Sequence, residues 1–384
     1  MKKITTKVLM ISVLTGLLTG CSGFFDKDNT PPPSALATVK TEIKVQPLWK
    51  VKTGSGVGKD YLRLVPAVTE QQVLTANKNG TVTATNKTTG KNVWTVTTGA
   101  DISAGPTAAD QLVIVASRQG EVIALNQANG NLIWKAQATS EVLAKPAVNN
   151  GVVVVKAIDG KLSAFASNDG HLLWHYQQTE PALILRGASA PQISHDTLVA
   201  GFANGNLAKL TLHGGNLQWQ APIAIPEGSF AIQRMIDIDA DPIISNNQVF
   251  VATYQGHIAD INLASGREIW THDLSSYTGM AVDIQQVYVS DAKSDIWAFD
   301  AETGKVLWRQ DQLEFRNVTG PASIGNYIVV GDSEGYLHWI SKQDGHLAAR
   351  IRVNSSAIIA APVVDNHIIY VVTTNGYLAA YTIG

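Results

Sequence analysis

Residues 106–134 read PTAADQLVIVASRQGEVIALNQANGNLIW, and the spacing of four residues in this stretch decides the fold. Gly120 follows Pro106 by 14 positions, Gly130 follows by 10 more, and Trp134 by a further 4. The same spacing recurs in four complete registers: Pro66/Gly80/Gly90/Trp94, Pro146/Gly160/Gly170/Trp174, Pro191/Gly205/Gly215/Trp219 and Pro242/Gly256/Gly266/Trp270. Three further registers keep part of it: Met280/Ser294/Gly304/Trp308, Pro321/Gly335/Gly345/Ala349 and Pro362/Gly376.

The repeat predicts four-stranded antiparallel blades. Its period is near 40 residues, and it consists of short runs rich in Val, Ile and Thr between glycine turns. In the second register we expect an inner strand opening at Pro106, followed by strands over 112–117, 121–126 and 131–136. The two glycines fall at hairpin turns, where a positive φ favours glycine. The sequence therefore predicts an all-β fold, an eight-bladed β-propeller.

Closure of the ring is expected to involve both ends of the chain. The eighth register begins at Pro362 and would reach its Trp only beyond Gly384. Residues 46–51, which read QPLWKV, carry Trp49 with no three strands before it. We expect this segment to be the missing fourth strand of the last blade, because an unpaired edge invites aggregation. The propeller is then predicted to span residues 43–384.

The tryptophans are expected to be structural. The seven at the repeat position fall on outermost strands beside a turn, where a large ring can pack between neighbouring blades. The other two, Trp297 and Trp339, fall on third strands, where packing is also the simpler expectation. A ligand-binding propeller would instead need aromatic residues gathered on one rim.

Composition and motifs argue against several classes of function. Hydrophobic residues make up 45% of the chain, charged residues 16%, and the net charge is −2, which is typical of half-buried strands rather than a nucleic-acid-binding protein. Residues 54–60, GSGVGKD, lack the first Gly and the final Ser or Thr of a phosphate loop. Residues 237–241 have calcium-loop spacing, but Pro242 and Gln248 stand where Gly and Glu are required.

No catalytic motif replaces these. The nine histidines are scattered, and there is neither a Gly-x-Ser-x-Gly elbow nor a cysteine nucleophile. We therefore expect a protein that is not an enzyme, with no catalytic residues, no cofactor and no metal.

The first 20 residues predict a secretory signal peptide. Three lysines precede an apolar stretch over 8–18 that is too short to span a bilayer. Residues 18–21, LTGC, resemble the lipobox of bacterial lipoproteins, which implies acylation of Cys21, the single cysteine. The alternative is an ordinary signal peptide with an incidental cysteine. Ser22, where Asp would imply inner-membrane retention, implies the outer membrane. Residues 21–42 are expected to form an extended tether.

Length variation points to a binding rim. The next repeat Pro lies 12 positions after Trp94, but 17 positions after Trp174 and 23 positions after Trp219. We expect these connectors, residues 175–190 and 220–241, to be neighbours on one face of the ring, because all connectors between blades emerge there. Long loops on a rigid scaffold commonly carry binding.

The content of the two connectors suggests an interface. Leu183 and Leu185 stand beside Arg186, and the second connector contains an Arg and two alternating carboxylates, at Arg234, Asp237 and Asp239. Aliphatic anchors around an Arg are typical of protein interfaces. In the alternative, Arg186 pairs internally with Asp237 or Asp239, and the residues alone leave both interpretations open.

Two family resemblances bear on function. Residues 301–308, AETGKVLW, resemble the pyrroloquinoline-quinone-type repeat, which occurs in calcium-dependent quinoprotein dehydrogenases with an adjacent disulfide-bonded Cys pair. A chain with one cysteine cannot form that disulfide. The lipobox, the repeats, residues 183–191, residues 234–239 and the segment VGDSEGYLHWI at 330–340 together resemble the BamB family of outer-membrane assembly lipoproteins.

The second resemblance implies a non-enzymatic scaffold. It would be lipid-anchored in the outer membrane, face the periplasm, and bind the POTRA domains of BamA within the BAM complex. The family's docking residues match Leu183, Leu185, Arg186, Asp237 and Asp239. Nascent outer-membrane proteins, held by edge pairing of their strands, are a further implied partner. A quinoprotein-like enzyme or a ligand-binding propeller remains the alternative.

Overall fold

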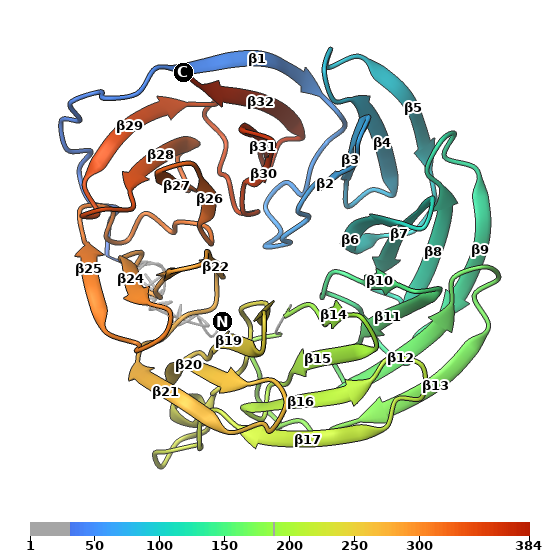
Figure 1. The fold of residues 1–384 in the computed structure, drawn as a ribbon. Helices are drawn as coiled ribbons and strands as arrows, with labels where there is room; N and C mark the ends of the chain where they lie inside the picture. Colours follow the sequence, from blue (N-terminus) through green and yellow to red (C-terminus); the bar gives the residue numbers. More distant parts are fainter. Residues whose placement is uncertain (1–30, 187–188) are drawn as a thin grey trace, which may run out of the picture. The chain divides into compact units, whose positions relative to one another are not determined.

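The computed structural model describes residues 31–186 and 189–384, so the predicted signal peptide and Cys21 lie outside the described residues. The described chain forms eight four-stranded antiparallel sheets arranged as the blades of a ring (Figure 1). The predicted all-β, eight-bladed propeller is confirmed. Its one short 3-10 helix, η1 (Ala231–Arg234), lies in a connector, and no helix in the described residues is long and apolar enough to cross a membrane.

The strands of each blade run from the inner to the outer side of the ring. Blades 1 to 4 contain β2 (Ala67–Val68), β3 (Gln72–Ala76), β4 (Thr81–Asn86), β5 (Asn92–Thr97); β6 (Ile102–Ala109), β7 (Leu112–Ser117), β8 (Glu121–Asn126), β9 (Leu132–Gln137); β10 (Ala147–Asn149), β11 (Val152–Lys156), β12 (Lys161–Ala166), β13 (Leu172–Gln177); and β14 (Gln192–Ser194), β15 (Thr197–Gly201), β16 (Asn206–Thr211), β17 (Leu217–Pro222).

Blades 5 to 8 contain β18 (Ile243–Ser245), β19 (Gln248–Ala252), β20 (His257–Asn262), β21 (Glu268–Asp273); β22 (Met280–Val282), β23 (Gln286–Ser290), β24 (Ile296–Asp300), β25 (Val306–Gln310); β26 (Ala322–Ile324), β27 (Tyr327–Gly331), β28 (Tyr336–Ser341), β29 (Leu347–Arg352); and β30 (Val363–Asp365), β31 (Ile368–Val372), β32 (Tyr377–Ile383), β1 (Val45–Lys52). In the second blade the predicted middle strands are confirmed, while the inner strand already begins before Pro106.

The N-terminal strand closes the ring as predicted. β1 pairs antiparallel with β32, and the eighth sheet has the order β1-β32-β31-β30. Trp49 stands opposite Ala380 in this pairing. Figure 1 shows β1, in blue, outside the dark red β32, so both ends of the described chain build one blade.

In seven of the eight blades the repeat Trp packs on the second repeat Gly of the next blade. Trp94 donates its Nε1–H to the Gln127 carbonyl at 2.9 Å. A Cβ on Gly130 would lie 2.7 Å from the Trp94 ring, and the φ of Gly130 is +76°. The other six Trp–acceptor pairs are Trp49–Lys87, Trp134–Ser167, Trp174–Leu212, Trp219–Leu263, Trp270–Ala301 and Trp308–Lys342. The Trp and Gly of the repeat are therefore two halves of one contact between blades, which confirms the structural interpretation of the Trp.

The single missing repeat Trp has a structural reason. Ala349 occupies that position in blade 7. In the next blade the two outer strands, β32 and β1, come from opposite ends of the sequence and are not joined by a hairpin. Blade 8 therefore has no hairpin glycine on which a Trp from blade 7 could pack. Instead, the large and the small residue of the facing pair change places between the third and fourth strands. In blades 1 to 3 an Ala on the third strand faces the Trp, whereas in blade 7 the fully buried Trp339 faces Ala349.

Candidate docking surface

One face of the ring carries both the connectors between blades and the hairpins between second and third strands. The Ala138 amide donates to the Gly120 carbonyl at 2.8 Å, and the Ile223 amide donates to the Gly205 carbonyl at 2.9 Å. These bonds tie the chain leaving a fourth strand to the hairpin glycine of the same blade. We call this side the connector face, and it is the face on which the long connectors were predicted to meet.

The two long connectors are hydrogen-bonded to each other. Residues 178–191 join β13 to β14, and residues 223–242 join β17 to β18. The Leu185 amide donates to Asp237 Oδ1 at 2.8 Å, and the Ala190 amide donates to Asp241 Oδ1 at 2.7 Å. Since both acceptors are side chains of the second connector, its carboxylates hold the first connector in place.

In the second connector, carboxylates alternate with apolar residues, and both kinds of side chain are buried. Ile238 packs against blade 4 so closely that a Cβ on Gly201 would lie 2.2 Å from its Cγ2. The intervening Asp237 and Asp239 are only 1% and 6% exposed. Asp239 Oδ1 lies 3.3 Å from Arg63 Nη2. Both predicted docking carboxylates are thus buried beneath the surface rather than displayed on it.

Arg186 has a different ionic partner from the one considered in the sequence. Its guanidinium pairs with Glu141 of the preceding connector, and its side chain remains 58% exposed. Asp237 instead accepts the Leu185 amide, and Asp239 pairs with Arg63. The structure thus gives Arg186 an ion pair with Glu141 at the surface, in place of the internal pair with Asp237 or Asp239 that the sequence had left open.

The remaining predicted docking residues lie at the surface. Leu183 is 44% exposed, Leu185 is half-buried, and Arg234 at the end of η1 is exposed. Sequence reasoning missed four apolar side chains that lie exposed on connectors of the same face: Tyr61, Ile225, Phe230 and Ile232. The only signal for these four side chains was the length of the connectors that carry them, because exposed apolar residues in a loop follow no period.

The loop that presents Phe230 and Ile232 is held by side-chain bonds. Gln233 Oε1 accepts the amides of Ser229 and Phe230 at 3.0 and 3.1 Å. Gln255 Nε2 donates to the Ile232 carbonyl at 3.1 Å. The two exposed apolar side chains, 69% and 62% exposed, are therefore offered by an ordered loop.

A recess lies beside Arg186. Its volume is about 310 Å³, and its apolar lining comes from Tyr61, Leu62, Leu143 and Leu185. Charged residues line it as well: Asp60, Arg118, Arg186 and Asp239. We call Leu183, Leu185, Arg186 and Arg234, together with the four additional apolar side chains, the docking surface.

Burial shifts the protonation of the acids beneath the docking surface. Desolvation raises the pKa of Asp237 to about 6 and that of Glu180 to about 7. Desolvation also lowers the pKa of Lys156, whose ammonium donates to the Gly201 carbonyl at 2.8 Å. Within residues 31–186 and 189–384, no group of three His, Cys, Asp or Glu side chains is arranged to hold a metal ion.

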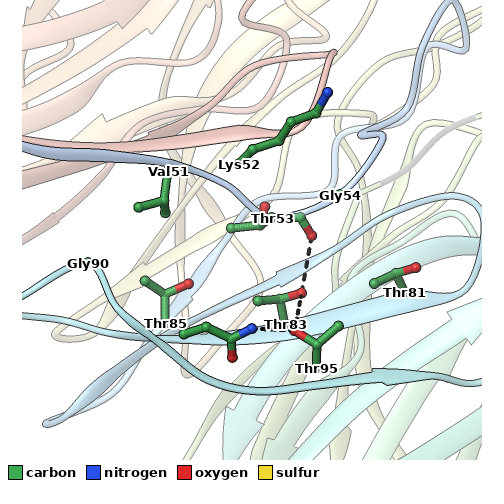
Figure 2. Close-up of a pocket in the computed structure, with 10 residues that line it drawn as sticks. Val51, Lys52, Thr53, Gly54, Thr81, Thr83, Thr85, Gly90 and Thr95 are labelled. Atoms are coloured by element: carbon green, nitrogen blue, oxygen red, sulfur yellow. Dashed lines mark hydrogen bonds between the residues drawn. The ribbon is translucent and has the colours of Figure 1, made fainter.

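A second groove, of about 390 Å³, lies where β1 meets blade 1 (Figure 2). Thr83 Oγ1 donates to the Thr53 carbonyl at 3.1 Å and lies 3.3 Å from Thr95 Oγ1. Figure 2 shows the Thr83 hydroxyl directed at Thr95, its neighbour on the adjacent strand of blade 1. They tie the end of β1 to the first blade, so this groove belongs to the closure of the ring.

Comparison with known proteins gives a consistent result. The profile of the family described as outer membrane protein assembly factor BamB matches residues 78–310 and 293–384. The BamB of Alkalilimnicola ehrlichii is 49% identical over 99% of this chain and 98% of its own length. That of Escherichia coli K12 is 35% identical over 93% of this chain and 94% of its own.

Solved structures show the same fold. The crystal structure of BamB from Moraxella catarrhalis matches with a TM-score of 0.82 at 24% identity, covering 88% of this chain and 100% of that one. A europium-containing methanol dehydrogenase matches with a TM-score of 0.74 at 12% identity, covering 90% and 95%. Both likenesses concern the fold alone.

Proposed function

This chain belongs to the family of outer membrane protein assembly factor BamB and functions in outer-membrane protein assembly, and from that premise we propose that it is a non-enzymatic, lipid-anchored scaffold that binds BamA. The assembly role follows from relatives that match nearly the whole chain. The partner, the anchor and the residues that serve them are the parts that we add.

We propose that the docking surface binds the periplasmic POTRA domains of BamA within the BAM complex. The observation that carries this assignment is the pair of cross-bonded connectors, which fix Leu183 and Arg186 at the surface beside further exposed apolar side chains. Rigid apolar anchors around an Arg concentrate binding free energy, because little conformational entropy is lost on association.

Asp237 and Asp239 act in this proposal as positioning residues. Asp237 holds the backbone at Leu185, and Asp239 binds Arg63, which also donates to the Tyr277 carbonyl at 2.7 Å. The family resemblance placed both aspartates among the docking residues, and their burial supports an indirect contribution. Removing Asp237 would release the connector that carries Arg186, and removing Asp239 would loosen the second connector from Arg63.

The anchor is proposed at Cys21, after removal of residues 1–20 as a signal peptide. Acylation there would hold the protein on the periplasmic side of the outer membrane. Residues 43–384 would form the propeller. Nascent outer-membrane proteins are proposed as a second class of partner, bound by pairing with an exposed outer strand.

Site-specific photocrosslinking in cells tests the docking assignment. A photoreactive residue at position 186 should capture BamA. Ala264 provides the matched control, because it is exposed on the hairpin between β20 and β21, on the opposite face of the ring. Equal capture of BamA from both positions would contradict the assignment.

A further inference from the structure

The segment before β1 is bound at both of its ends, to the connector between blades 6 and 7 at one end and to blade 7 at the other. At one end the Ser34 amide donates to the Glu314 carbonyl at 3.0 Å, and Ser34 Oγ donates to the Gln312 carbonyl at 3.0 Å. Both acceptors lie between β25 and β26, in a connector of the connector face. Ser34 therefore lies on the same face as the docking surface.

A buried arginine completes this attachment. Arg316 is 2% exposed, and its Nη1–H donates to the Ser34 carbonyl at 2.8 Å. The rest of its guanidinium is held by Asp332, at 2.8 Å from Nε, and by Glu334. Because these carboxylates fix the guanidinium, Arg316 presents an oriented donor to the chain at Ser34.

The other end reaches the opposite face. The Glu42 amide donates to the Ala348 carbonyl on β29 at 2.9 Å. Glu42 Oε2 lies 2.9 Å from His346 Nε2, in the hairpin between β28 and β29. Hairpins between third and fourth strands lie opposite the connector face. The segment thus crosses the outer side of the ring, where Figure 1 shows it as a thin blue trace beyond β29.

Apolar contacts hold the middle of the crossing. Val39 packs against a buried cluster that contains Trp308, Leu313 and Leu347. Ile43 is 9% exposed and belongs to the core cluster of blades 7 and 8. We call residues 34–44 the strap. Its contacts involve backbone, side-chain and apolar groups. Residues 34–42, which the sequence assigned to an extended tether, therefore pack on the outer side of the propeller instead.

We propose that the strap makes the tether leave the ring on the connector face and thereby holds that face, with its docking surface, toward the bilayer. The proposal rests on the anchor at Cys21 proposed above. Residues 22–33 can span at most about 40 Å at roughly 3.5 Å per residue, whereas a released chain as far as residue 44 could span about 80 Å. The strap therefore roughly halves the reach of the tether and fixes its point of departure.

Hydrogen exchange on the full-length protein tests the strap itself. The amides of Ser34 and Glu42 should be protected, and Val39→Asp should make residues 34–42 exchange about tenfold faster or more, because the middle contact is lost. Thr38→Asp is the matched control, since Thr38 is exposed and the same charge there leaves the packing intact. Fast exchange in the native protein would overturn the strap.

Energy transfer to the bilayer tests the orientation. Acylated protein on liposomes would carry one donor dye, either at Glu227→Cys on the connector face or at Ala264→Cys on the opposite face, with acceptor dye in the lipid. Both positions are exposed and flank blade 5, far from the strap in sequence. Transfer should be higher from position 227, and Val39→Asp should remove the difference.

The outcomes separate the strap from the anchor. Equal transfer from both positions in the native protein would overturn the proposed orientation. Mass spectrometry of the N-terminal peptide checks acylation beforehand. Absence of acyl chains would refute the anchor and, with it, the orientation toward the bilayer, while exchange still decides whether the strap is docked.

Discussion

Asp237 is a carboxylate with almost no exposed surface, lying between two isoleucines that pack on blade 4. Its Oδ1 accepts the Leu185 amide at 2.8 Å, while its Oδ2 has no hydrogen-bond partner in the described chain. A half-satisfied buried carboxylate is costly when ionised. Its raised pKa, about 6, reports that cost, and the gain is a fixed position for the connector that carries Arg186.

The pH dependence of stability should reveal this cost. An unfolded Asp has a pKa of about 3.9, so the folded state holds the proton more tightly and loses stability as pH rises from about 4 through 6. Asp237→Asn cannot ionise, and its amide oxygen can still accept the Leu185 amide. Between pH 4 and pH 7 the free energy of unfolding of the variant should rise by about 2 kcal/mol relative to that of the native protein. Melting temperatures of both proteins across this range measure it, and a constant difference would contradict the assignment.

Arg186→Ala should weaken binding of the BamA POTRA domains by tens of fold, about 2 kcal/mol, because an Arg among apolar anchors concentrates interface energy. Its side chain is 58% exposed, so the melting temperature should change little. Titration of purified POTRA domains measures the loss. Arg267→Ala, on the opposite face, is the control and should bind normally. Unchanged binding by folded Arg186→Ala protein would refute the docking surface.

At the scale of the element, the unit of construction is the contact between a fourth strand and the next blade. The repeat Trp fills the space that a Cβ would occupy at the next hairpin glycine, and its indole N–H caps a carbonyl beside that hairpin. This pairing was only partly predictable. The sequence placed Trp and Gly at fixed spacing and predicted packing between blades, but the spacing alone did not show that the ring of one repeat meets the glycine of the next.

Gly130→Ala should test this contact. The new Cβ would lie 2.7 Å from the Trp94 ring and would also sit at a φ of +76°. We expect the free energy of unfolding to fall by about 3 kcal/mol, because overpacking and backbone strain act together. Gly99→Ala is the control, since the φ of Gly99 is +79° but no other group lies within 4 Å of the place its new methyl group would take. It should lose only about 1 kcal/mol. Urea unfolding of both variants gives the comparison, and equal losses would show that the ring contact is unimportant.

At the scale of the whole molecule, the ring depends on a blade built from both ends of the chain. Removing residues 43–52 exposes the edge of β32 and strips the Trp49 ring from Gly90. We expect thermal unfolding at a much lower temperature and a tendency to aggregate. Deleting residues 22–33, ahead of the strap, should change the melting temperature little. Equal melting of the two deletion variants would contradict closure by β1.

Anchoring is the other property of the whole molecule. Cys21→Ala removes the only thiol, so the protein should lose its acyl chains and leave the outer-membrane fraction. Fractionation of cells with mass spectrometry of the N-terminal peptide measures this. An acylated variant still in the outer membrane would refute the lipidation site.

The incomplete registers at the two ends of the chain predicted closure by residues 46–51, and residue spacing alone predicted the blades, their number and the face on which the long connectors meet. These follow from short-range rules, since a hairpin turn, a strand period and a connector length are each written within about 40 residues of chain. The tertiary structure alone decided which charges meet. Arg186 pairs with Glu141, 45 residues away, and Arg63 pairs with Asp239, 176 residues away. Which charged side chains meet depends on how connectors from different blades cross one face of the ring, and no local sequence pattern encodes that crossing. The same reason explains the strap, because the contact between Ser34 and Arg316 joins residues 282 positions apart and exists only once the ring has closed.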